Sequence, residues 1–158
     1  MRVNLLLDDD RHILSGFLNL DPFATGKDER VVSDINNFDK YVDDAEAEVL
    51  IARHILCWFP TNQVAPILHY WFKKIKLGGV LIIEECDFEN IAFHITDGSL
   101  GLGDAQKLLW GPQDKQWNMK KSGLSVLSLA EYLENSNFKI LKKRNEQYNF
   151  VIEAMRLA

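Results

Sequence analysis

The sequence predicts one α/β domain over residues 1–158, built on a mostly parallel sheet of about seven strands. Three observations support this fold class. Short apolar runs, bounded by polar or glycine-containing segments, recur along the chain as buried strands do. One segment has the apolar spacing of an amphipathic helix that packs on a sheet. Two strand-like segments at the C-terminal end follow each other so closely that they must pair antiparallel.

The first half of the sequence contains four predicted strands and little helical signal. Residues 4–7 and 17–20 are short apolar runs, and the nine residues between them are too few for an ordinary crossover helix. Residues 30–33 predict a third strand and residues 48–52 a fourth, separated by a polar loop or weak helix. We therefore expect the first crossover to be reduced to a turn, in a sheet that is covered on both faces.

Helices alternate with strands in the second half. A helix capped by Thr61 is predicted over residues 61–75, ending at Gly78-Gly79. The glycine-rich and aromatic segment 88–122 is predicted to form a lid over the site. The remaining expected elements are helices over residues 90–95, 104–110 and 126–135, the last capped by Ser125, and strands over residues 80–83, 138–141 and 148–155, with a turn over residues 142–147.

Composition narrows the function classes. A formal net charge of −5 argues against a protein that binds nucleic acid through bulk electrostatics. Cys57 and Cys86 lie far apart and form no CxxC pair, so neither a disulfide framework nor a zinc site is indicated, and we expect a cytoplasmic, reducing environment. We expect no signal peptide and no membrane span, because the longest apolar stretch is interrupted by Arg53 and His54.

The segment up to Asp21 is the most informative one. A strand, a turn and a second strand that ends at a carboxylate form the pattern of a nucleotide-binding α/β domain, because the carboxylate can accept from both hydroxyls of a ribose. The alternative is that Asp21 caps the turn before Pro22. The turn after the first strand has the sequence Leu6-Leu7-Asp8, where a cofactor that approaches the backbone needs glycines.

Five pieces of the sequence resemble the small class I S-adenosylmethionine-dependent methyltransferases, and together they extend over almost the whole chain. The first is segment 3–23, with Gly16-Phe17 and Asn19-Leu20-Asp21-Pro22-Phe23. The others are Val31-Val32-Ser33-Asp34, the stretch from Ala52 to Pro60, the turn Ile75-Lys76-Leu77-Gly78-Gly79, and the tail from Lys120 to Phe138. The resemblance implies a Rossmann-like fold with a seven-stranded, mostly parallel sheet and an antiparallel C-terminal strand.

The resemblance also implies a site for S-adenosylmethionine at the carboxyl edge of the sheet. The family pattern places Asp21 on the ribose, and Asp34 and the backbone of Ile35 at the adenine. It places Ala52 and His54 beside the methionine part. Transfer of an activated methyl group depends mostly on positioning and exclusion of water, so no particular catalytic residue is implied. The acceptor is expected to be a small molecule or a glycan, with no metal, nucleic acid or membrane involved.

Departures from the family pattern fall on this same site. Leu6-Leu7-Asp8 stands where the family has Gly-Cys-Gly, Cys57-Trp58 where it has Glu-His, and Lys120 where it has a His. Two functions therefore stay open: a methyltransferase-like protein with impaired cofactor binding, and a catalytically inactive relative that serves as a binding or assembly module. A nicotinamide-dependent dehydrogenase is disfavoured, because no GxGxxG follows the first strand.

Other candidate residues have simple explanations. Asp8, Asp9 and Asp10 could bind a hard cation, but three adjacent acids cannot all point inward, so solvated loop charges are favoured. Trp110 and Trp117 either line a substrate pocket or pack the lid onto the core.

Overall fold

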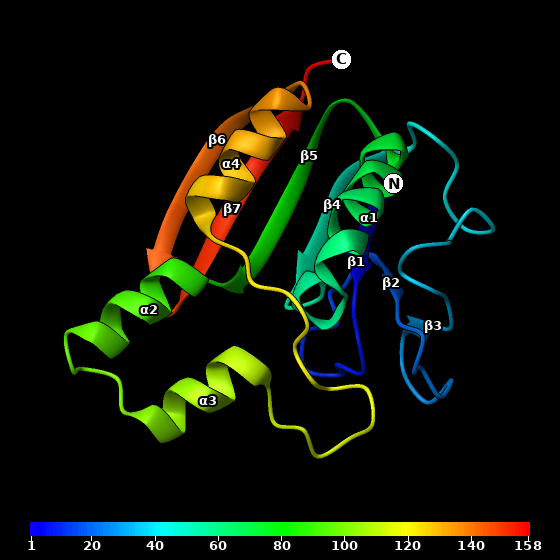
Figure 1. Ribbon diagram of the computed structural model, residues 1–158. Helices are drawn as coiled ribbons and strands as arrows, with labels where there is room; N and C mark the ends of the chain where they lie inside the picture. The colour runs from blue at the N-terminus through cyan, green and yellow to red at the C-terminus, as the bar shows by residue number, and fades with distance from the viewer.

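A computed structural model describes residues 1–158 and contains a seven-stranded sheet of order β3-β2-β1-β4-β5-β7-β6 (Figure 1). The strands are β1 (Arg2–Leu5), β2 (Leu18–Leu20), β3 (Arg30–Val31), β4 (Ala47–Arg53), β5 (Ile75–Cys86), β6 (Phe138–Glu146) and β7 (Asn149–Arg156). The helices are α1 (Thr61–Lys74), α2 (Phe88–Thr96), α3 (Leu102–Trp110) and α4 (Val126–Asn135), with a 3₁₀ turn η1 (Leu56–Trp58). Only β7 runs in the direction opposite to the other strands, which confirms the predicted fold class.

The register of the parallel strands brings four strand ends to one edge of the sheet. Leu20 of β2, Leu5 of β1, Ala52 of β4 and Ile83 of β5 form one row of cross-strand neighbours, and all four are fully buried. The residues that follow them leave the sheet together. The strand order reverses between β1 and β4, and open α/β sheets bind ligands at such a point, outside the carboxyl ends of the strands.

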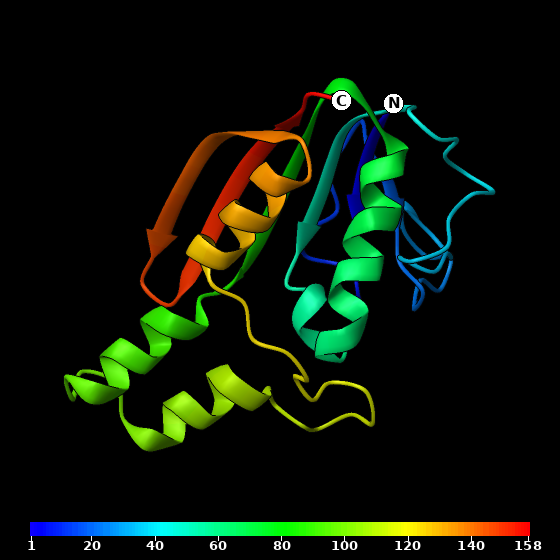
Figure 2. The same ribbon diagram turned by 45° about the horizontal axis from the view of Figure 1, so that its top comes forward.

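The hydrophobic core lies between the sheet and helices α1 and α4, which cover the same face in both views (Figures 1 and 2). Ile67, Leu68, Trp71 and Phe72 of α1 are buried, as their helical spacing predicts. The indole N–H of Trp71 donates to the carbonyl of Ile35 over 2.7 Å, so the largest side chain of this face has its polar atom satisfied.

The opposite face of the sheet carries no helix, contrary to the expectation of two covered faces. The loop of residues 8–17 replaces the first crossover, as predicted, and two buried asparagines hold it. Asn4 donates to the Asn19 side chain over 2.8 Å and to the His12 carbonyl over 2.9 Å. Asn19 bonds the backbone N–H and carbonyl of Leu14 at 3.0 Å each. Side-chain amides thus fix this connection where a helix would otherwise pack.

The prediction that Gly78-Gly79 ends α1 is wrong. The helix ends at Lys74 and β5 begins at Ile75, so both glycines lie inside the strand. A Cβ atom at Gly79 would lie 2.9 Å from the carbonyl oxygen of Ala47 on β4. Glycine is needed there because two backbones approach closely, and not because a helix ends.

Several other boundaries differ from prediction. Thr61 is the first residue of α1 and makes no capping bond, whereas Ser125 caps α4 by accepting the N–H of Ser128 over 3.2 Å, as predicted. The third strand stops at Val31, earlier than predicted. Strand β6 continues to Glu146, through residues that were predicted to form a turn. It is the edge strand and its polar side chains are solvent-exposed, so its pairing with β7 does not require an apolar pattern.

Helices α2 and α3 lie beyond the carboxyl edge of the sheet and pack on each other through a small cluster of Ile91, Leu100 and Ala105 (Figure 1). They confirm the two short helices predicted within the lid segment. None of the helices is both long and apolar enough to cross a membrane. Residues 111–125 then lead from α3 past the strand ends to α4.

Candidate functional site

Asp21, the predicted ribose ligand, is completely buried at the end of β2. Its Oδ1 accepts hydrogen bonds from the N–H groups of Asp8 (3.0 Å) and Phe23 (2.9 Å). Its Oδ2 accepts from the N–H of Asp9 (3.2 Å) and from the guanidinium of Arg30 (2.9 Å). Four donors of this chain therefore occupy both oxygens. This geometry fixes the loops after β1 and β2, as the capping alternative describes.

Arg30 is a part of the site that sequence reasoning missed. It lies on β3, which pairs with β2, and its side chain is 8% exposed. Besides Asp21 it binds Asp28, with Nε at 3.0 Å from both carboxylate oxygens. The hydrogen bonds with Asp28, together with Asp21, raise the pKa of Arg30 above its usual range. Only the pairing of β2 with β3 brings Arg30 to Asp21, so the sequence alone carries no clear signal for it.

The two residues predicted at the adenine lie just beyond β3. Asp34 is exposed and forms an isolated bridge with Asn37. Ile35 is buried, and its carbonyl is the acceptor for the Trp71 indole. Asp34 is thus accessible to a ligand, whereas Ile35 anchors α1.

The two residues predicted beside the methionine part lie at the end of β4. Ala52 is fully buried in the sheet. His54 leaves the sheet with a left-handed φ of 51°, and its N–H donates to the Glu84 carbonyl over 2.8 Å. Its Nε2 lies 3.6 Å from the Glu84 carboxylate. Burial lowers the pKa of His54 against the opposing pull of Glu84, which favours a neutral imidazole at neutral pH.

A second buried carboxylate, Glu85, lies near the end of β5. Its Oε1 accepts the N–H groups of Ile55 (2.9 Å) and Leu56 (2.7 Å), while its buried Oε2 has no hydrogen-bond partner. Burial raises the pKa of Glu85 to about 7. The sequence contains a signal for this position, because every second residue of a strand lies on the same face. Glu85 follows Leu81 and Ile83 in this alternation, which places its carboxylate on the core side.

Lys120 lies close to this second carboxylate. Its Nζ donates to the Leu108 carbonyl over 2.8 Å, contacts Cys86 Sγ at 3.1 Å, and lies 5.8 Å from the centre of the Trp58 ring. A cavity of about 20 Å³ beside Cys57, Cys86 and Lys120 has room for one water molecule. Burial raises the pKa of Cys57, so this thiol stays protonated and unreactive.

Trp117 packs the lid segment onto the strand ends. Its ring stacks on Phe23, with centroids 5.1 Å apart and an interplanar angle of 22°. It meets Trp58 edge to face at 5.7 Å. Lys115 forms an ion pair with Asp8, the last residue of the Leu6-Leu7-Asp8 turn after β1. Trp117 thus takes the packing role of the two alternatives considered for it.

Two of the three acidic residues after β1, Asp8 and Asp9, have side-chain partners within the chain. Asp8 pairs with Lys115, and Asp9 Oδ2 lies 2.6 Å from His12 Nδ1. Hydrogen bonding to His12 helps lower the pKa of Asp9 against the opposing effect of burial. No group of three or more histidine, cysteine or carboxylate side chains is arranged to hold a metal ion.

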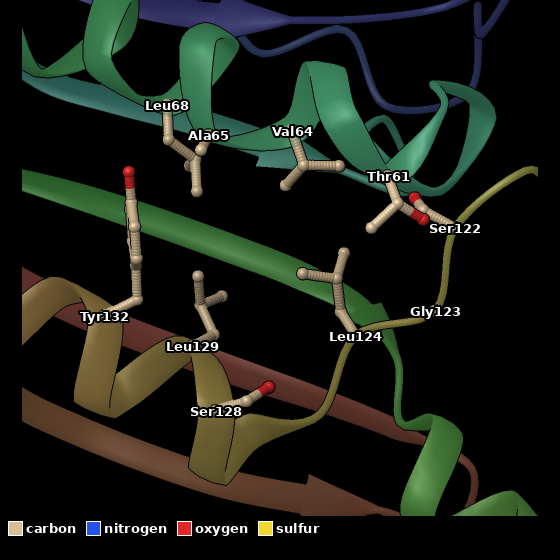
Figure 3. Close-up of a pocket in the computed structure, with 10 residues that line it drawn as sticks. All are labelled: Thr61, Val64, Ala65, Leu68, Ser122, Gly123, Leu124, Ser128, Leu129 and Tyr132. Carbon is tan, nitrogen blue, oxygen red and sulfur yellow. The ribbon is translucent and has the colours of Figure 1, made fainter.

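A separate apolar groove of about 210 Å³ lies between α1 and α4. Figure 3 shows Val64 and Leu68 of α1 facing Leu129 and Tyr132 of α4 across it. The Tyr132 hydroxyl is buried without a partner, and burial raises the pKa of this phenol. The groove contains no charged side chain and none of the predicted site residues, so it can hold an apolar group but offers no acid or base.

Comparison with known proteins defines the fold. No family model and no curated protein sequence matches the chain. A SAM-dependent methyltransferase from Methanosarcina mazei matches with a TM-score of 0.59 at 14% identity, over 90% of this chain and 83% of that protein. One from Archaeoglobus fulgidus matches with a TM-score of 0.58 at 14% identity, over 89% of this chain and 76% of that protein.

A third similar structure is that of 1,6-didemethyltoxoflavin-N1-methyltransferase from Burkholderia thailandensis with bound 1,6-didemethyltoxoflavin and S-adenosylhomocysteine. The TM-score is 0.59 at 10% identity, over 90% of this chain and 61% of that protein. The chain spans only 36% of an O-methyltransferase family protein from the same organism, with a TM-score of 0.55. The chain therefore has the class I SAM-dependent methyltransferase fold, and at these identities the likeness concerns the fold alone.

Proposed function

We propose that this chain is a methyltransferase-like protein whose cofactor site is rebuilt, so that S-adenosylmethionine binds weakly or not at all. The state of Asp21 carries the proposal. Its two oxygens are buried and already accept four hydrogen bonds from Asp8, Asp9, Phe23 and Arg30. A ribose diol would have to displace some of these donors and leave them unpaired, which is unfavourable for buried groups. The residues present do not fit the cofactor in this conformation.

The loop after β1 supports the same proposal. Leu6 is 2% exposed, and its N–H donates to the Leu20 carbonyl over 2.8 Å, so backbone bonding between β1 and β2 extends beyond Leu5. Asp8 has a φ of 54°, a conformation that favours glycine, but its N–H is directed at Asp21. The backbone groups that a glycine-rich loop would offer to a cofactor are used inside the chain.

A second candidate function is that of a catalytically inactive binding or assembly module. The sheet face opposite α1 and α4 favours it. Val80 and Ile82 of β5 and Met155 of β7 alternate with core residues, so they lie on that face, and they are partly exposed. Glu153 lies opposite Ile82 on the same face, so this uncovered face offers a partner molecule both apolar and charged side chains.

Calorimetric titration with S-adenosylmethionine and S-adenosylhomocysteine tests the proposal. We expect a Kd weaker than about 100 μM for both, and a low-micromolar or tighter Kd would contradict us and favour an active methyltransferase. The variants Asp21→Asn and Asp34→Ala compare the buried and the exposed predicted ligand. Any residual binding should depend on Asp34 and not on Asp21. The methyl acceptor, a small molecule or a glycan, stays a prediction.

A further inference from the structure

We propose that residues 111–120 form a latch that keeps a ring-binding slot closed at the carboxyl edge of the sheet, with Trp117 as its internal occupant. The inference rests on the proposed function, because it concerns the same strand ends. Phe23 follows β2 and Trp58 follows β4, and β1 lies between these strands in the sheet. The slot between Phe23 and Trp58 therefore lies where the strand order reverses, which is the ligand position of an open α/β sheet.

The contacts of Trp117 are those with which proteins hold planar ligands. Its stack on Phe23 at 5.1 Å and 22° and its edge-to-face contact with Trp58 at 5.7 Å are favourable aromatic geometries. Nucleobases stack on aromatic side chains in the same way, largely without regard to sequence. Phe23 is 41% exposed even with Trp117 in place, so its ring becomes an open platform when Trp117 leaves. The slot would take a planar aromatic ring such as a purine.

The latch is a closed loop held by its own bonds. The buried side chain of Asn118 accepts the Lys115 N–H over 2.9 Å. The Lys120 N–H donates to the Trp110 carbonyl over 3.0 Å, which joins the two ends of the loop. Gly111, with a φ of 78°, begins the loop directly over Trp58, since a Cβ there would lie 2.9 Å from the indole ring. These internal bonds keep the shape of the loop around Trp117, and the N–H groups of Lys121 and Ser122 bond the Cys57 carbonyl just beyond it.

Near Trp117 the latch is fastened to the sheet by one ion pair, whereas Lys120 at its end contacts Cys86 of β5. Lys115 pairs with Asp8 through side chains that are 50% and 31% exposed, and exposed ion pairs are weakened by salt. Lys115 also lies 5.5 Å from the centre of the Trp117 ring. The Asp8 N–H, by contrast, bonds Asp21. The part of the latch around Trp117 can therefore move off Phe23 while the contacts of Lys120 and the hydrogen bonds of Asp21 stay in place.

Titration with adenosine tests the latch, because adenosine carries the planar ring without the methionine part. We expect Trp117→Ala to bind adenosine about tenfold more tightly than the wild-type protein, as the stacking of one base on Phe23 can supply. Trp110→Ala is the matched control, since Trp110 is 49% exposed at the end of α3. Adding Phe23→Ala to Trp117→Ala should abolish the gain. Far-ultraviolet circular dichroism and urea unfolding confirm that each variant is folded.

The outcomes separate this inference from the proposed function. A gain in Trp117→Ala that is absent in Trp110→Ala and lost in the double variant supports the latch. Equal affinities of the wild type, Trp117→Ala and Trp110→Ala overturn it, and so does a lack of binding by all of them. The proposed function fails on a different result, which is low-micromolar binding of S-adenosylmethionine by the wild-type protein.

Discussion

Two buried carboxylates lie at the same edge of the sheet, and the chain satisfies them in different ways. Asp21, after β2, is 0% exposed and receives three backbone N–H groups and one guanidinium. Glu85, the second-last residue of β5, is 1% exposed. One of its oxygens accepts two backbone N–H groups, while the other has no partner. One carboxylate is enclosed by a complete set of donors, and the other is not.

The difference shows what each carboxylate can do. Asp21 has a cation in direct contact, so its charge is compensated inside the protein, and its oxygens have no free direction for a ligand. Glu85 is buried without a direct cation contact, and its pKa is raised to about 7. The predicted cofactor ligand thus has the character of a structural ion pair, whereas the carboxylate that titrates near neutral pH is one that the family pattern did not select.

The largest effect is expected at Asp21. Asp21→Ala should lower the free energy of unfolding by about 3 to 5 kcal/mol, because it leaves the nearly buried Arg30 and three N–H groups without their acceptor. Urea unfolding measures the loss. Asp28→Ala is the matched control, since it removes the more exposed partner of Arg30 and should cost clearly less than Asp21→Ala. Similar small losses in both variants would show that Asp21 is not the structural centre of this strand end.

The fold could be predicted because its main elements follow from side-chain periodicity. The apolar runs of the parallel strands and the spacing of Ile67, Leu68 and Trp71 determine which surfaces must be buried. The errors occur where periodicity carries no information. Gly79 resembles a helix terminator but is required by the approach of β4, and the edge strand β6 is polar on residues that face solvent.

The candidate site could be predicted only in part. The position of Asp21 at a strand end follows from local sequence, but its partners do not. Arg30 reaches it through strand pairing, and the Asp8 and Asp9 N–H groups through the conformation of a loop. Trp117 is far from Phe23 in sequence, so their stacking depends on the path of the lid segment. Long-range contacts of this kind determine whether a strand-end carboxylate is open to a ligand.

An intermediate, pH-dependent effect is expected at Glu85. Its pKa is about 7 in the folded protein and near the usual 4.5 when unfolded, so the folded state binds more protons between these values. The stabilisation of the folded state by the protonated Glu85 side chain is fully present below pH 4.5. It decreases as the pH rises and levels off above pH 7. The wild type should therefore lose up to about 3 kcal/mol relative to Glu85→Gln over this interval.

Urea unfolding of both proteins from pH 4.5 to pH 8 checks this expectation. Taking the difference between Glu85→Gln and the wild type cancels the opposite contribution of His54, whose lowered pKa makes the folded state lose stability on the acid side. His54 contacts Glu84 and not Glu85, so the substitution leaves its surroundings in place. A difference that stays constant with pH would show that Glu85 titrates like an exposed carboxylate.

The smallest effect is expected at Lys115, and it shows whether the Asp21 network stands apart from the lid. Lys115→Met removes the ion pair with the Asp8 side chain and leaves the Asp8 N–H on Asp21. The free energy of unfolding should fall only slightly, and less than in the other variants, because both side chains are partly exposed. Hydrogen exchange should become faster for the N–H groups of residues 111–120, while those of Asp8 and Asp9 stay protected. Equal acceleration in both places would mean that the lid holds the Asp21 network together, and the two carboxylates would then differ less than their hydrogen bonds indicate.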